Sequence, residues 1–142
     1  MTIKEEQDAI IEEFSLYPDW MEKYEYIIQL GKELPLIDPS FKTDDNLIRG
    51  CQSKVWLHTG LRDGRLWFTA DSDALITKGL VSMVVRIMTG HTPQEIVSSE
   101  VYFIDAIGLS SHLSQTRSNG LLAMLKQIKA YALAYVVKSQ AS

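Results

Sequence analysis

The sequence predicts a single α+β domain, in which a small antiparallel β-sheet has several helices packed on one face. Three observations support this. The first third has apolar residues at helical spacing, the middle contains two β-rich runs joined by an Asp-Gly turn, and the remainder returns to helical spacing. The chain of 142 residues is long enough for one hydrophobic core, so we expect one domain over residues 1–142.

Two helices are expected at the start of the chain. Apolar residues recur every three or four positions from Ile3 to Ser15, with charged residues between them. A second amphipathic pattern begins near Pro18, which suits the first turn of a helix, and Pro35 is expected to end it.

The centre of the chain predicts a β-hairpin. Val55 to Leu61 and Leu66 to Thr69 are rich in β-branched and aromatic residues, and Asp63-Gly64 between them is a typical hairpin turn. Leu47-Ile48 suggests a third short strand ahead of the hairpin.

A strongly apolar helix is expected from Ala74 to Met88, at the centre of the core. Asp71-Ser72-Asp73 precedes it and supplies side chains of the type that cap helices. Gly79 in its middle disfavours a helix by about 1 kcal/mol relative to alanine, so we expect that it allows another element to approach closely.

Three more helices complete the prediction. Thr92-Pro93-Gln94-Glu95 is a capping box with proline at the first helical position, and Val101 to Leu109 suits a further short helix. Ser114 is expected to cap the last helix, whose apolar stripe is Leu121, Leu122, Leu125, Ile128, Ala132 and Val136.

Charge and composition disfavour nucleic acid and membranes as partners. The net charge is -4, and the basic residues are scattered rather than clustered. The longest apolar stretches contain lysine or arginine, so we expect no membrane span, and the acidic, polar N-terminus does not resemble an export signal. A cytoplasmic protein is expected.

Cys51 is the single cysteine of the sequence. One thiol excludes an internal disulfide and any metal site that needs several thiolates. Cys51 is expected on a loop next to Gly50, where a tight turn can present a nucleophile, although a lone cysteine is more commonly a small buried apolar residue.

Several motifs in order resemble the SufE family of sulfur-acceptor proteins. They are Leu30-Gly31-Lys32-Glu33-Leu34-Pro35, Gly50-Cys51-Gln52-Ser53-Lys54-Val55-Trp56, Asp71-Ser72-Asp73-Ala74-Leu75-Ile76-Thr77-Lys78-Gly79-Leu80 and Leu113-Ser114-Gln115-Thr116-Arg117-Ser118-Asn119-Gly120-Leu121. The resemblance runs from about Trp20 to the final helix.

The resemblance implies a function in sulfur transfer. A family member accepts persulfide sulfur on the cysteine of this motif, here Cys51, from a SufS-type cysteine desulfurase, stimulates that enzyme, and passes the sulfur to an iron–sulfur scaffold complex of the SufBCD type. It also implies the fold that the family shares with IscU-type scaffolds. Such a scaffold holds its cluster with several cysteines, so one cysteine argues against that role here.

The chemistry needs little beyond a thiolate, so no bound cofactor or metal is expected; pyridoxal phosphate belongs to the partner desulfurase. A nearby cation would increase the ionised fraction of the thiol. Arg117 is a candidate for that role, or for tying the final helix to the loop of Cys51. Gly50 and Gln52 flank the thiol in the motif, and Asp71 and Asp73 either cap a helix or help to place the loop.

Two other functions stay open at this point. The protein could be an adaptor that activates a desulfurase by binding alone. Its status as an enzyme is uncertain in either case, since the leading expectation is a sulfur carrier with a covalent cysteine persulfide rather than a stand-alone enzyme. A cysteine-dependent hydrolase would need a histidine near Cys51 as a base, and the sequence offers His58, His91 and His112, for each of which a structural role is favoured.

Overall fold

The predicted α+β class is confirmed. The computed structural model describes residues 1–48 and 53–141. Its helices are α1 (Ile3–Ser15), α2 (Trp20–Gly31), α3 (Leu75–Met88), α4 (Pro93–Ser98), α5 (Phe103–Ile107) and α6 (Gln115–Ala141), and its strands are β1 (Val55–Arg62) and β2 (Arg65–Ser72). Short 3-10 turns occur at Pro39–Phe41, Asp44–Asn46 and Leu109–Ser111.

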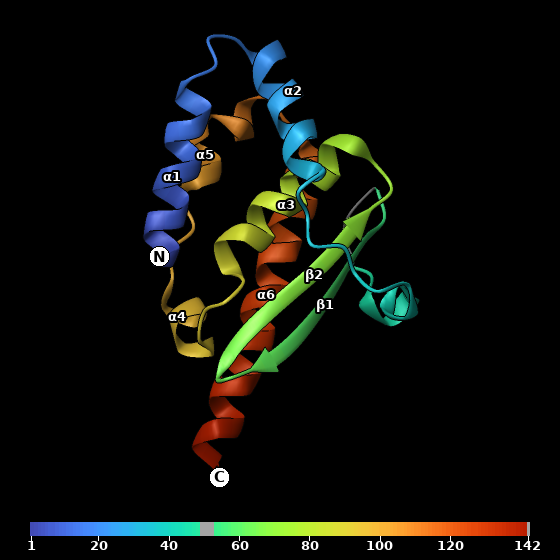
Figure 1. The fold of residues 1–142 in the computed structure, drawn as a ribbon, viewed down its shortest axis with the longest axis vertical. Coiled ribbons are helices and arrows are strands. Elements are labelled where there is room, and N and C mark those ends of the chain that lie inside the picture. Colours follow the sequence, from blue (N-terminus) through green and yellow to red (C-terminus); the bar gives the residue numbers. More distant parts are fainter. Residues whose placement is uncertain (49–52, 142) are drawn as a thin grey trace.

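Helix α3 is the centre of the molecule, as its composition predicted. It packs against β2 on one side and against α1, α2 and α6 on the others. Figure 1 shows the hairpin as one layer, with α3 and the long α6 next to it and α1 beyond α3. The helices therefore cover one face of the hairpin, and most of α3 is buried.

The first two helices form where they were expected, with different ends. Thr2 and Glu5 form a capping box at the start of α1. Asp19 caps α2, so Pro18 precedes the helix rather than opening it. The prediction that Pro35 ends α2 was wrong, because the helix finishes at Gly31 and Lys32 to Leu34 form tight turns with bonds from i to i−3.

Gly79 brings α2 and α3 into direct backbone contact. A Cβ atom at this position would lie 2.0 Å from the carbonyl oxygen of Ile27. Gly31 lies at the same crossing, where an added Cβ would be 3.1 Å from the backbone nitrogen of Gly79. The expected close approach is confirmed, and two glycines from different helices create it.

The hairpin turn has the conformation that its residues predicted. Asp63 and Gly64 both have positive φ, 56° and 75°, the conformation of a type I′ turn. Leu47 makes a single antiparallel bridge with Trp56, so the third strand suggested for Leu47-Ile48 is reduced to one bridge. On β1, Val55 and Leu57 are buried toward the helices.

The last third contains the expected helices with two adjustments. The capping box of Thr92 and Glu95 is present at the start of α4, and α5 is shorter than the predicted segment from 101 to 109. Ser114 accepts a hydrogen bond from the backbone N–H of Arg117, as a capping residue of α6 does. Leu122 belongs to the predicted apolar stripe of this helix, but it is 56% exposed.

Helix α6 is apolar enough between Arg117 and Ser139 to cross a membrane by length and composition alone. The lysines within α6 therefore do not rule out a membrane span, contrary to the prediction. The core helix of a soluble protein has the same signature, and α6 contributes Leu121, Met124, Leu125 and Ile128 to the core.

We predict that Gly79→Ala destabilises the protein by at least about 2 kcal/mol, because the new methyl group overlaps a backbone carbonyl that cannot rotate away. Gly60→Ala is the matched control, since nothing lies within 4 Å of its Cβ position. Urea unfolding of both variants measures the difference. Equal stabilities for the two variants would contradict the close helix crossing.

Candidate functional site

Three of the site residues predicted from the sequence, Gly50, Cys51 and Gln52, lie outside the described residues. The structure nevertheless describes both ends of the segment that contains them. The described residue before the segment, Ile48, lies at the end of the hairpin where β1 begins, because it bonds to Val55.

The incoming end of the segment is bonded to the hairpin. The backbone N–H of Ile48 donates a hydrogen bond of 2.8 Å to the carbonyl of Val55, and the preceding Leu47 is paired with Trp56. Ile48 is itself buried. The chain thus enters the cysteine segment from a fixed position.

The outgoing end is held by Asp73 and Ser72 through the backbone of Lys54. The Asp73 carboxylate accepts a hydrogen bond of 3.0 Å from the Lys54 N–H, and the N–H of Asp73 donates to the Lys54 carbonyl at 3.3 Å. The Ser72 hydroxyl also donates to this carbonyl, at 2.9 Å. Lys54 is three residues beyond Cys51, so these bonds fix the chain directly after the site.

The prediction that Asp71-Ser72-Asp73 caps α3 was wrong. The N-cap position is Ala74, and no side chain accepts the N–H bonds of the first turn there. The carboxylates are used in tertiary contacts instead, because β2 continues to Ser72 and turns both aspartates toward other segments. The alternative interpretation, that they help to place the cysteine loop, agrees with the bonds of Asp73.

Asp71 joins three segments. Its carboxylate lies 3.0 Å from the ammonium of Lys42 and 3.4 Å from that of Lys78, and it accepts a hydrogen bond from the Ser72 N–H. Partial burial alone would raise the pKa of Asp71, but the hydrogen bonds from Lys42 and Ser72 and the charge of Lys78 outweigh it and lower the pKa below its ordinary value.

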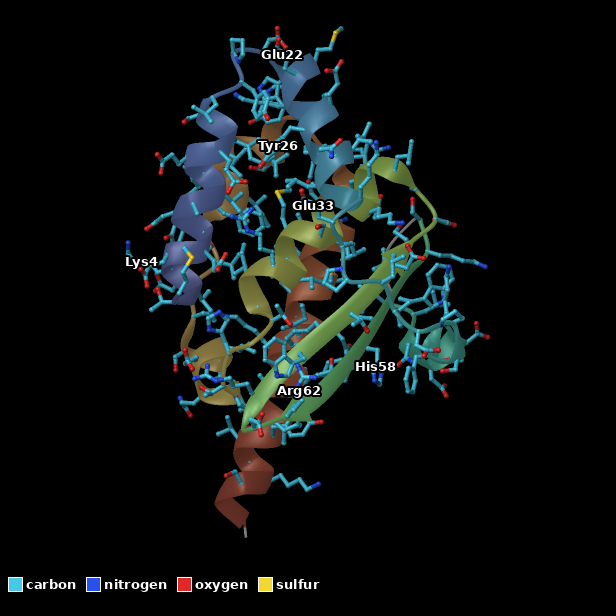
Figure 2. The ribbon with its side chains drawn as sticks, in the orientation of Figure 1. Lys4, Glu22, Tyr26, Glu33, His58 and Arg62 are labelled. Carbon is cyan, nitrogen blue, oxygen red and sulfur yellow. The ribbon has the colours of Figure 1, made fainter. Side chains whose placement is uncertain are left out.

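The segment before the site packs on the outer face of β1. The ammonium of Lys42 lies 4.5 Å from the ring centre of Trp56, and Phe41 stacks on His58 with ring centres 3.8 Å apart. Figure 2 shows His58 on the side of the hairpin where this segment lies. The sequence analysis missed Lys42, which is 29 residues from Asp71 and has no local pattern that indicates the contact.

Arg117 is exposed on the first turn of α6. Its backbone is held by Ser114, and its side chain forms no ion pair with any residue in 1–48 or 53–141. Neither of the two roles predicted for it is supported by a contact. Both depend on the segment of Cys51, so both stay predictions.

Each histidine makes a structural contact. His58 stacks on Phe41, His112 stacks on Trp20 with ring centres 3.7 Å apart, and the buried His91 lies 3.4 Å from Glu95. Among the described residues there is no group of three His, Cys, Asp or Glu side chains that suits a metal ion. The hydrolase alternative needs the position of Cys51 and stays untested.

We predict that Asp71→Asn lowers the free energy of unfolding by about 1–2 kcal/mol at neutral pH, because it leaves two lysines without their carboxylate. Since folding lowers the pKa of Asp71, its stabilisation is complete above the ordinary value of 3.8 and is lost as the pH falls through the folded value. The difference between wild type and variant should therefore shrink from about pH 5 toward pH 2.

Urea unfolding at a series of pH values checks this. The control is Asp44→Asn, which removes a carboxylate without an ion pair to any described residue. A difference that stays constant with pH would show that the charge of Asp71 does not stabilise the junction.

Comparison with known proteins identifies the family. Residues 8–132 match the model of the SufE family, described as an Fe-S metabolism associated domain. An uncharacterized SufE-like protein of Rhizobium meliloti (strain 1021) is 40% identical over 130 residues, covering 88% of this chain and 93% of that protein.

The fold has a counterpart of known structure. The solution structure of a hypothetical protein from Thermus thermophilus superimposes with a TM-score of 0.76 and 16% identity, covering 93% of this chain and 96% of that one. At that identity the likeness concerns the fold alone. The family match and the 40%-identical relative confirm the resemblance seen in the motifs: this chain belongs to the SufE family, whose domain is associated with iron–sulfur metabolism.

Proposed function

We propose that this protein accepts persulfide sulfur on Cys51 from a cysteine desulfurase, stimulates that enzyme by removing its product, and passes the sulfur to iron–sulfur cluster assembly. The observation that carries the proposal is the family match over residues 8–132, which includes the motif from Gly50 to Trp56 with the one cysteine of the sequence.

The transfer is an exchange between sulfur atoms. The Cys51 thiolate attacks the outer sulfur of the persulfide on the desulfurase, a new S–S bond forms on Cys51, and the thiolate of the desulfurase leaves. In the second transfer a thiolate of the next acceptor attacks the outer sulfur of the Cys51 persulfide, and the Cys51 thiolate leaves. Nothing is oxidised or reduced overall, and the chain needs no cofactor of its own; pyridoxal phosphate acts on the desulfurase.

A single thiol suits a carrier. A second cysteine within reach would attack the persulfide, close a disulfide and release the sulfur as sulfide. The sequence contains only Cys51, so a persulfide there has no partner thiol in the same chain. This supports a carrier rather than a cluster scaffold, which requires several cysteine ligands.

The junction around the segment supports the same proposal. Hydrogen bonds at Ile48 and Lys54 hold the chain on both sides of residues 49–53, so the segment is joined to a firm base on the hairpin. A nucleophile that must meet a sulfur atom on another protein needs a defined base from which to be presented. We propose a SufS-type desulfurase as the donor, a SufBCD-type scaffold complex as the acceptor, and the cytoplasm as the location.

We predict that incubation with a cysteine desulfurase and free cysteine adds the mass of one sulfur atom to the protein. Intact-protein mass spectrometry measures the gain, which a thiol reductant should remove. Cys51→Ser should show no gain, whereas Ser53→Ala, a control in the same segment, should gain sulfur as the wild type does. Sulfur on the Cys51→Ser variant would overturn the assignment of the acceptor.

We also predict that the wild type raises the rate of alanine formation by the desulfurase in the absence of added reductant, and that Cys51→Ser does not. The reason is that the enzyme turns over again only after its persulfide has been removed. Alanine release measures the rate. Full stimulation by Cys51→Ser would favour the adaptor alternative, in which binding alone activates the enzyme.

A further inference from the structure

One face of α3 carries polar residues that its apolar composition does not explain. Ser82, Arg86 and Thr89 follow each other at spacings of four and three, so they lie on one side of the helix and its C-terminal end. Two of them have clear structural partners. Arg86 binds Glu13 and Glu6 of α1, and the Thr89 hydroxyl accepts the backbone N–H of Phe68 at 3.0 Å.

Ser82 has no such partner. Ser82 is only 7% exposed. Its hydroxyl makes no hydrogen bond with any residue in the described part of the chain. The Ser15 hydroxyl on α1, by contrast, donates a hydrogen bond to the carbonyl of Glu12. Among the described side chains only the Thr59 hydroxyl is both fully buried and without a partner, so the Ser82 hydroxyl still reaches solvent, through the cleft that it lines, and is free to bond a molecule held there.

Ser82 opens into a cleft of about 220 Å³ between the end of α2 and α3. Figure 2 shows Glu33 just beyond the end of α2, at the level of α3. The polar groups of the cleft are Ser82, Arg86, Thr89 and Glu33, and its apolar wall consists of Leu30, Pro35, Met83 and Val85. Its volume is below the roughly 300 Å³ at which drug-sized sites begin, so it suits a small or slender ligand.

The charges of the cleft decide the class of ligand. Arg86 binds Glu13 with both terminal nitrogens, at 3.0 and 2.6 Å, and its Nε lies 3.4 Å from Glu6. Hydrogen bonds from Arg86 and Tyr26 keep the pKa of Glu13 low, so both the arginine and its partner are charged. One cation faces two carboxylates, and a ligand carboxylate or phosphate would find no unbalanced positive charge there.

Glu33 adds a further negative charge at the edge of the cleft. It is exposed and forms no ion pair with a residue that the structure describes. The site therefore offers a carboxylate at its edge, a hydroxyl inside and an apolar wall. A cationic head group that donates several hydrogen bonds, attached to an apolar chain, matches all three features.

We propose that this cleft binds an alkylammonium group, a primary amine on a short aliphatic chain, which donates hydrogen bonds to Ser82 and Glu33 while its methylene groups lie on the apolar wall. The proposal does not depend on sulfur transfer. The group can come from a free aliphatic amine or from a lysine side chain of another protein, since both have the same head group and stem.

The test compares three probes of equal chain length, 1-aminopentane, 1-pentanol and pentanoate, added to the full-length 15N-labelled protein. Amide chemical shifts measure binding. The amine should bind saturably with a roughly millimolar dissociation constant and shift residues around Ser82 and Glu33, whereas the alcohol and the anion should bind at least about tenfold more weakly. Equal binding of the alcohol, preference for the anion, or no saturable shift with the amine would overturn the proposal.

Three variants separate the site from general charge effects. Ser82→Ala should weaken amine binding about tenfold and leave folding unchanged, because its hydroxyl has no partner to lose. Glu33→Gln should weaken it about threefold, as an exposed ion pair does. Glu22→Gln is the matched control at the opposite end of α2 (Figure 2) and should bind as the wild type does. Unchanged affinity in Ser82→Ala would overturn the proposal even if the amine binds.

A fourth probe, Nα-acetyl-lysine amide, distinguishes the two sources of the group. If it binds as 1-aminopentane does, a lysine of a partner protein can enter the cleft. If 1-aminopentane binds and the blocked lysine does not, the cleft takes free amines only. Persulfide formation on Cys51 is measured separately, so failure of amine binding and failure of sulfur transfer are distinguishable.

Discussion

The contact between α2 and α3 at Gly79 determines where the polar groups of this protein lie. The carbonyl of Ile27 occupies the space that a side chain at position 79 would need. This close contact fixes both the rotation of α3 about its axis and its distance from α2. Lys78 precedes this contact and reaches Asp71, and Ser82 follows it by three residues and faces the cleft. A small rotation of α3 would move both side chains, since they lie on one side of the helix.

The sheet depends on α3 for a second reason. A two-stranded hairpin is marginal in water without a partner that covers its apolar face. Here β2 packs directly on α3, and Leu66, Phe68 and Ala70 are buried between the strand and the helices. The hairpin in turn provides the bonds that hold the cysteine segment. The residues that flank the cysteine segment therefore depend on two contacts, the crossing of α2 and α3 and the packing of β2 on α3.

Features that depend on neighbouring residues were the ones best predicted from the sequence. Asp63-Gly64 indicated a type I′ turn because few residues adopt positive φ, and Gly79 indicated close packing because a glycine inside an apolar helix has a cost that something must offset. The errors came from competition with distant partners. Asp71 and Asp73 have the composition of a helix cap, but groups 29 and 19 residues away bind them instead, and no spacing in the sequence indicates those contacts. The motif was enough to name Cys51 as the candidate nucleophile, which stays a prediction, whereas the bonds at Ile48 and Lys54 could be found only from the fold.

The way the cysteine segment is attached separates its chemistry from the stability of the fold. A backbone hydrogen bond joins Ile48 to Val55. Because few residues separate the two in the sequence, closing the connection between them costs little conformational entropy. The bonds of Lys54 with Asp73 and Ser72 isolate β1 from changes in the segment. A carrier that exchanges sulfur with two different proteins has to expose its thiol to each of them. Because the bonds described at both ends of the segment are made by residues outside 49–52, substitution of Cys51 removes the proposed nucleophile without removing any of these bonds.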